Sequence, residues 1–133
     1  MASKFDAVVT CSDQLWSPAG LGTNFYNLMF VPDEVKKISF ASSFGVSQIP
    51  WYQKRATAEY LQRINYVSCR ENRGAEIVKE LIGRDVPVLM DPVFAFDKEQ
   101  WDKLVPEEKV YDEPYIFCYF LGSNIAYREA VKK

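Results

Sequence analysis

Residues 6–18 decide the fold, and they read Asp-Ala-Val-Val-Thr-Cys-Ser-Asp-Gln-Leu-Trp-Ser-Pro. The apolar run at residues 7–9 predicts a buried strand, which ends in the polar cluster formed by Ser12, Asp13 and Gln14. In open α/β sheets, ligands bind outside the carboxyl ends of the strands. The stretch therefore predicts one strand of an α/β sheet with a binding loop at its end.

Short apolar runs alternate with segments of helical periodicity along the rest of the chain. Strands are expected at residues 5–11, 37–42, 66–69, 86–90 and 115–121, with a further extended segment at 25–30. Helices are expected at residues 57–64, 71–82, 97–106 and from about 124 onward. This alternation predicts an α/β fold: a Rossmann-like parallel sheet with helices on both faces.

Two of the expected helices carry recognisable end signals. Gly83 follows the helix at 71–82, where it can adopt the left-handed conformation that ends helices. Asp97 and Gln100 have the spacing of a capping box, and Phe96 and Trp101 have the spacing of a hydrophobic staple.

The composition narrows the functional class. The chain has 133 residues and a net charge of −2, which gives no basis for nucleic-acid binding. No segment is long and apolar enough to span a membrane, and the three separated cysteines (Cys11, Cys69 and Cys118) favour a reducing, cytoplasmic location. The chain has no histidine. It therefore holds neither a Ser-His-Asp or Cys-His catalytic system nor a histidine metal site, and no cofactor is expected.

The first candidate site is the loop after the first strand. Ser12, Asp13 and Gln14 can hydrogen-bond a ligand, with Trp16 as a stacking or packing wall. The same polar residues also commonly cap a helix or form an Asx turn, and this alternative stays open.

Arg70 and Asp91 follow the strands at 66–69 and 86–90. A guanidinium beside the amino end of a helix suits an anionic small molecule, although a salt bridge is an equal alternative. Asp91 precedes Pro92, which favours an extended backbone there. It can accept from a sugar hydroxyl or orient Arg70.

Four segments in order resemble the polysaccharide pyruvyl transferase family. Residues 6–18 are similar to its D-x-V-x-x-G-S-D-Q-x-W-N-P segment, with Cys11 and Ser17 in place of glycine and asparagine. Residues 36–45 resemble K-x-x-Y-A-A-S-F-G, and residues 67–74 resemble S-V-R-E-x-x-G. Residues 88–92 resemble V-x-D-P-T, with Val93 in place of the threonine.

The resemblance implies an enzyme that transfers a pyruvyl group from phosphoenolpyruvate to a pair of sugar hydroxyls, forming a ketal on a cell-surface polysaccharide precursor. It implies a catalytic role for Arg70 and substrate contacts for Ser12, Asp13, Gln14, Trp16 and Asp91. The family has a GT-B-like architecture of two Rossmann-type halves. On this basis residues 1–122 are expected to be part of the amino-terminal half and residues 123–133 the start of a helix leading to the second.

Such a fragment is expected to be inactive alone and to self-associate through its exposed half-cleft. A nucleotide-sugar glycosyltransferase on the same scaffold and a non-catalytic saccharide-binding domain are the alternative functions.

Overall fold

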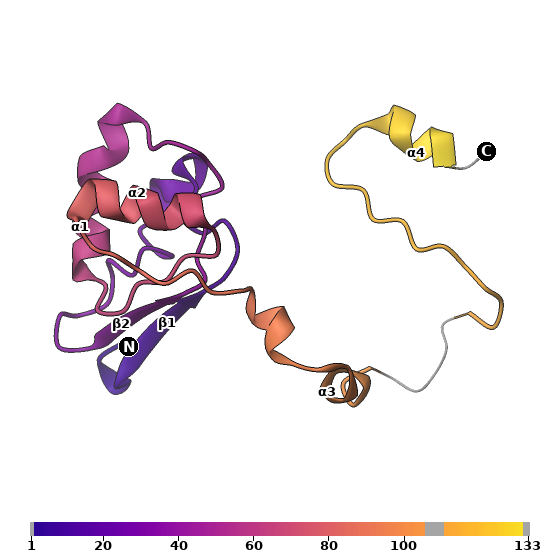
Figure 1. The fold of residues 1–133 in the computed structure, drawn as a ribbon, viewed down its shortest axis with the longest axis horizontal. Helices are drawn as coiled ribbons and strands as arrows, with labels where there is room; N and C mark the ends of the chain where they lie inside the picture. Colours follow the sequence, from indigo (N-terminus) through magenta and orange to yellow (C-terminus); the bar gives the residue numbers. More distant parts are fainter. Residues whose placement is uncertain (1, 106–110, 132–133) are drawn as a thin grey trace.

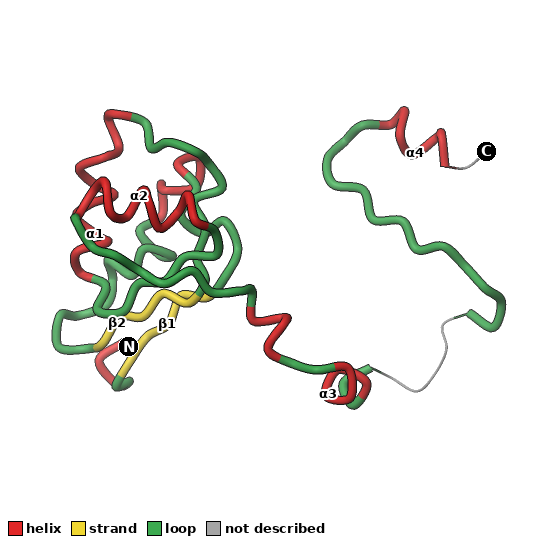
Figure 2. Tube along the Cα trace, in the orientation of Figure 1, coloured by secondary structure: helices red, strands yellow, loops and turns green. Residues whose placement is uncertain are grey.

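The computed structural model describes residues 2–105 and 111–131. Its sheet is built on two parallel strands, β1 (Ala7–Cys11) and β2 (Lys36–Phe40), shown in Figures 1 and 2. Ala7 lies opposite Lys36, and Cys11 lies opposite Phe40. Both strands occur where the sequence predicts them, so the α/β class and the parallel pairing are confirmed.

Two further predicted strands are present as single parallel bridges. Ile38 bridges Tyr66, Ser42 bridges Cys69, and Cys69 in turn bridges Val88. Backbone hydrogen bonds join these segments, among them the Leu89 N–H to the Cys69 carbonyl at 2.8 Å. The carboxyl ends of four parallel segments therefore meet at one edge of the sheet.

Two helices form the main layer over the sheet, on the same side of the strands in Figure 1. They are α1 (Lys54–Arg63), which follows the 3-10 helix η3 (Trp51–Gln53), and α2 (Asn72–Ile82). Gly83 ends α2 with φ +71°, as predicted. The remaining elements are η1 (Ala2–Lys4), η2 (Pro18–Thr23), η4 (Pro92–Ala95), α3 (Lys98–Asp102) and α4 (Ile125–Val131).

The core lies between the two helices and the sheet. Trp16 is completely buried at its centre, with its ring centroid 5.2 Å from that of Phe44 and 5.8 Å from that of Tyr60. Leu61 of α1 and Val78 of α2 are also fully buried. The loop that follows β1 is thus fixed by an aromatic cluster.

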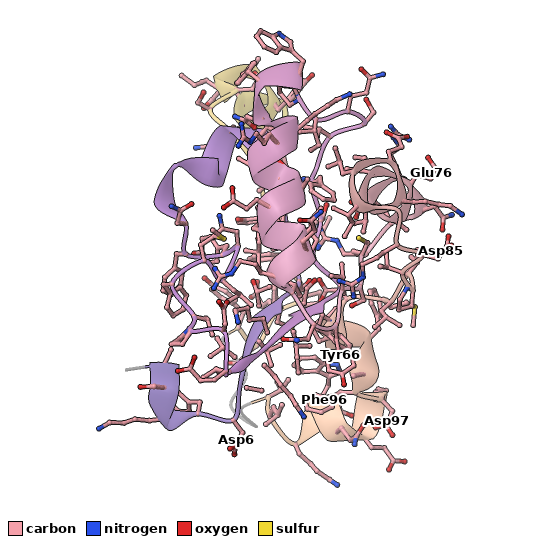
Figure 3. All side chains as sticks on the ribbon, turned by 90° about the vertical axis from the view of Figure 1, so that its left-hand side faces the viewer. Asp6, Tyr66, Glu76, Asp85, Phe96 and Asp97 are labelled. Atoms are coloured by element: carbon pink, nitrogen blue, oxygen red, sulfur yellow. The ribbon has the colours of Figure 1, made fainter. Side chains whose placement is uncertain are left out.

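The opposite face of the sheet is open. Val9, Phe40 and Tyr66 share that face and are 52%, 36% and 61% exposed. In Figure 3, Glu76 of α2 is labelled above the strands and Tyr66 beside their lower part. Within the described residues, helices cover one face only, so the expectation of helices on both faces is not met there.

Arg63 and Lys37 fix the segment that leads into β2. The Arg63 guanidinium donates to the Met29 and Val31 carbonyls at 3.0 and 2.9 Å. The buried Lys37 ammonium donates to the Pro32 carbonyl at 2.7 Å. Residues 25–30 form turns rather than the predicted extended segment, because these bonds fold the chain back on itself.

The capping box between Asp97 and Gln100 is confirmed, and the ring centroids of Phe96 and Trp101 are 5.3 Å apart.

The strand predicted at 115–121 is wrong: among the described residues it pairs with no other segment, and Ile116 is 90% exposed. Residues 106–110, part of the predicted connector, lie outside the described residues. The division into residues 1–122 and 123–133 stays a prediction. No helix in the described ranges combines the length and apolarity that a bilayer crossing needs.

Candidate functional site

Backbone hydrogen bonds join the ends of three neighbouring segments, β1, β2 and residues 66–69. The Ser12 N–H donates to the Phe40 carbonyl at 2.7 Å, and the Ser43 N–H donates to the Asp13 carbonyl at 2.9 Å. The Arg70 N–H donates to the Ser42 carbonyl at 3.2 Å. The loops after β1, β2 and the 66–69 segment therefore form one continuous surface.

Asp91 is the hub of this surface. The Ser12 hydroxyl and the Arg70 guanidinium both donate to its Oδ2, the latter at 3.2 Å from Nη1. The Val93 N–H donates to Oδ1 at 3.1 Å. The hydrogen bond from Ser12, then that from the Val93 backbone and then Arg70, lower the pKa of Asp91 below its ordinary value. Asp91 is therefore a carboxylate at neutral pH.

From the lowered pKa of Asp91 we predict how the stability of the fold changes in acid. A carboxyl whose pKa is lower in the folded than in the unfolded state stabilises the fold fully above its unfolded pKa of about 3.9. That contribution disappears as the pH falls through the lower folded value. We expect the free energy of unfolding of the wild type to fall more steeply below about pH 4 than that of Asp91→Asn, measured by urea unfolding.

Asp6→Asn, which changes an exposed carboxylate just before β1, is the control for this comparison. It is expected to keep the steeper wild-type slope. Equal slopes for the wild type and Asp91→Asn would contradict the role of Asp91 as an ionised hub.

Arg70 keeps donors free for a ligand. Its side chain is 32% exposed, and among the described residues its single charged contact is Asp91, reached through Nη1. The Nε and Nη2 atoms of Arg70 have no acceptor among the described residues. Helix α2 begins two residues later, at Asn72, and the backbone N–H groups of its first turn have no partner within the helix.

The backbone of the site is strained. Ser12, Asp13 and Ala41 have φ values of 53°, 60° and 51°, in the left-handed region that non-glycine residues seldom adopt. Gly45 has φ +64°, and a Cβ atom there would lie 2.7 Å from Cδ of Gln14. Such strain persists only where surrounding contacts hold it, and it concentrates at functional sites.

The sequence-predicted residues fall into three groups. Ser12, Arg70 and Asp91 meet directly, as described above. Asp13 and Gln14 are exposed on the adjoining turn, where the Gln14 N–H donates to Asp13 Oδ1 at 2.7 Å. Trp16 is buried and donates from Nε1 to the Tyr26 carbonyl at 3.3 Å, so its position is that of a packing wall beneath the loop.

Two residues of the site were not singled out individually by the sequence. The Ser43 hydroxyl donates to Glu71 Oε1 at 2.9 Å and accepts from the Gly45 N–H at 3.0 Å. This pair fixes the loop after β2 to the start of α2. Glu71 stands next to Arg70 in the family-like segment at 67–74, but no sequence signal pairs it with Ser43, which is 28 residues away.

Cys69, at the end of its segment, is not an activated thiol. Burial, and secondly the nearby Glu71 charge, raise its pKa to about 12. A thiol with this pKa is protonated at neutral pH and is a poor nucleophile. The chemistry of the site therefore depends on Arg70, the carboxylates and the hydroxyls.

Comparison with known proteins identifies the family. The sequence profile of the polysaccharide pyruvyl transferase family matches residues 2–132, nearly the whole chain. No match was found among curated proteins or among solved structures. Three of the four sequence segments noted above supply Ser12, Arg70 and Asp91, which meet at the strand ends. The chain belongs to the polysaccharide pyruvyl transferase family.

Proposed function

We propose that the chain carries the phosphoenolpyruvate-binding wall of a pyruvyl transferase that forms ketals on saccharides. The observation that carries this proposal is Arg70, whose guanidinium contacts Asp91 through Nη1 and keeps its other donors free, two residues before the start of α2. Phosphoenolpyruvate carries a carboxylate and a phosphate, and either anion suits a guanidinium fork beside a helix amino end.

The reaction that this wall would serve is a balanced group transfer. The methylene carbon of phosphoenolpyruvate takes up a proton and becomes a methyl group, which leaves an oxocarbenium-like centre at the neighbouring carbon. Two sugar oxygens form bonds to that carbon, and its bond to the phosphate oxygen breaks. Of the two hydroxyl protons released, one balances the proton taken up by the methylene and the other leaves with phosphate.

Each residue of the site has a different role in this reaction. Arg70 binds the anion and stabilises negative charge on the departing phosphate. Asp91 already accepts three hydrogen bonds, so it serves as the group that orients Arg70. Asp13 is exposed and has one oxygen without a donor among the described residues, so it is the carboxylate that receives the sugar hydroxyls, with Gln14 beside it.

The reaction also needs an acid that donates a proton to the methylene carbon of phosphoenolpyruvate. The chain has no histidine, and Asp91 is held ionised. We propose that a second Rossmann-type half of a GT-B-like enzyme supplies this acid, and that the enzyme works in the cytoplasm. The open sheet face, with Val9, Phe40 and Tyr66, is consistent with a further layer or with self-association.

Binding of phosphoenolpyruvate to the chain tests the proposal. Two-dimensional ¹H–¹⁵N NMR during a titration is expected to show shifts at Arg70, Ser12 and the first turn of α2. Uridine diphosphate glucose is the comparison ligand, because a nucleotide-sugar enzyme would prefer it. Shifts at these residues with the nucleotide sugar and none with phosphoenolpyruvate would overturn the proposal.

A further inference from the structure

Ser43 is the residue at which three parts of the site meet. It is 3% exposed, and its hydrogen bonds reach the turn after β1, its own loop and the start of α2. Its N–H donates to the Asp13 carbonyl at 2.9 Å, and its carbonyl accepts from the Trp16 N–H at 3.1 Å. The backbone of Ser43 therefore holds the turn that carries the Asp13 carboxylate.

The direction of the bond from the Ser43 hydroxyl follows from its two partners. The Gly45 N–H can only donate, so the Ser43 oxygen accepts this bond at 3.0 Å. The hydroxyl has a single proton, which it donates to the Glu71 carboxylate at Oε1, 2.9 Å away. Glu71 is therefore the acceptor that fixes the direction of the Ser43 side chain.

The first turn of α2 leaves room for the Glu71 carboxylate. Glu71 is half-buried, and among the described residues its side chain bonds to Ser43 and has no lysine or arginine within ion-pair distance. Gly74 lies in this first turn, although glycine is unfavourable inside a helix. A Cβ atom at position 74 would lie 3.0 Å from Glu71 Oε1 and 3.2 Å from Cβ of Cys69. The glycine thus lets the carboxylate lie against the helix and reach Ser43.

The turn that Ser43 holds is strained, and its contacts extend to the arginine of the site. Ser12 and Asp13 have φ values of 53° and 60°, so their backbone keeps this shape only while surrounding contacts hold it. The Ser12 hydroxyl donates to Asp91, which also accepts from the Arg70 guanidinium. A turn released from Ser43 would therefore disturb both the Asp13 carboxylate and the orientation of Arg70.

We propose that Glu71 is a positioning residue, which through the Ser43 hydroxyl fixes the Asp13 turn relative to Arg70. It acts through Ser43 rather than on a substrate. This inference deepens the proposed function and rests on it for the roles of Asp13 and Arg70. The role needs a hydrogen-bond acceptor at position 71 but no negative charge, and two neutral variants can separate these properties.

Glu71→Gln and Glu71→Met are both uncharged and have side chains of similar length. The glutamine oxygen can still accept the Ser43 proton, whereas the methionine sulfur is only a weak acceptor. Backbone order parameters from ¹⁵N NMR relaxation are expected to stay at about 0.85 for Asp13 and Gln14 in Glu71→Gln, and to fall toward about 0.6 in Glu71→Met. Val78, buried in α2, is the reference and is expected to stay rigid in both.

The affinity for phosphoenolpyruvate measures the effect on the site. Both variants remove the same negative charge near an anion site, so the difference between them reports the hydrogen bond alone. Isothermal titration calorimetry is expected to show about fivefold weaker binding by Glu71→Met than by Glu71→Gln. Glu59→Met, at an exposed glutamate of α1, is the control and is expected to bind as the wild type does.

A variant of Ser43 keeps the test informative if Glu71→Met disturbs the fold. Ser43→Ala removes the donor and leaves Glu71 in place, so it is expected to loosen the Asp13 turn and to bind phosphoenolpyruvate about fivefold more weakly than the wild type. Glu71→Gln and Glu71→Met, each added to Ser43→Ala, are expected to bind alike, because the hydrogen bond is already absent.

The outcomes separate this inference from the proposed function. In a protein that binds phosphoenolpyruvate, equal affinities of Glu71→Gln and Glu71→Met would overturn the inference, even if the turn is looser in Glu71→Met. A wild type that does not bind phosphoenolpyruvate rejects the proposed function, and the order of the turn in the two variants then still decides whether Glu71 positions Asp13.

Discussion

We expect the Arg70→Ala variant to bind phosphoenolpyruvate about tenfold to hundredfold more weakly than the wild type. The physical reason is the fork of charge-assisted hydrogen bonds that a guanidinium forms with a carboxylate or phosphate. Arg70 is one-third exposed and contacts Asp91 through Nη1, so its Nε and Nη2 donors, which have no partner among the described residues, are available to a ligand. Isothermal titration calorimetry at low salt measures the change.

Two further variants distinguish the effect of the positive charge of Arg70 from the effect of its planar shape and orientation. Arg70→Lys keeps the positive charge but presents no planar fork, so it is expected to recover only part of the affinity. Asp91→Asn leaves the guanidinium in place but less firmly oriented, so its loss is expected to be smaller than that of Arg70→Ala. Full affinity in Arg70→Ala, with Arg55→Ala as the exposed-arginine control, would remove Arg70 from the binding site.

The largest stability effect is expected for Trp16→Ala, at about 3–5 kcal/mol of unfolding free energy. Trp16 is completely buried between Phe44 and Tyr60, and its indole nitrogen holds the Tyr26 carbonyl. The free energy of unfolding of a domain of this size is only about 5–15 kcal/mol, so the variant is expected to lose a large part of its stability. Urea unfolding followed by circular dichroism measures the change.

Trp51 provides the matched control, because it is the same residue type and is 82% exposed. Trp51→Ala is expected to change the unfolding free energy by less than about 0.5 kcal/mol. Trp16→Phe keeps an aromatic ring in the core and is expected to retain phosphoenolpyruvate binding. Equal destabilisation by the two alanine variants would contradict a central packing role for Trp16.

Local signals in the sequence predicted much of the fold. The run at residues 7–9 predicted β1, the spacing of Asp97 and Gln100 predicted the cap of α3, and Gly83 predicted the end of α2. These features depend on neighbours a few residues away, so a sequence pattern is enough to locate them. The rule that ligands bind at strand ends placed Ser12, Arg70 and Asp91 at one sheet edge, and the structure brings them into contact.

The errors came from features that distant partners decide. Residues 115–121 have the composition of a strand, but a strand exists only where another segment pairs with it, and none does among the described residues. Residues 25–30 bend because Arg63, more than 30 residues away, holds the Met29 and Val31 carbonyls. Ala41 adopts φ 51°, although alanine carries no sequence signal for a left-handed backbone.

The left-handed backbone at Ser12 and Asp13 matters for anyone who engineers this protein. Glycine adopts that conformation without strain, so a selection for thermal stability alone would favour glycine at both positions. Each such exchange would discard a group of the site: the hydroxyl that donates to Asp91, or the carboxylate next to Gln14. Glycine at this turn would therefore relieve backbone strain and remove both polar groups at the same time.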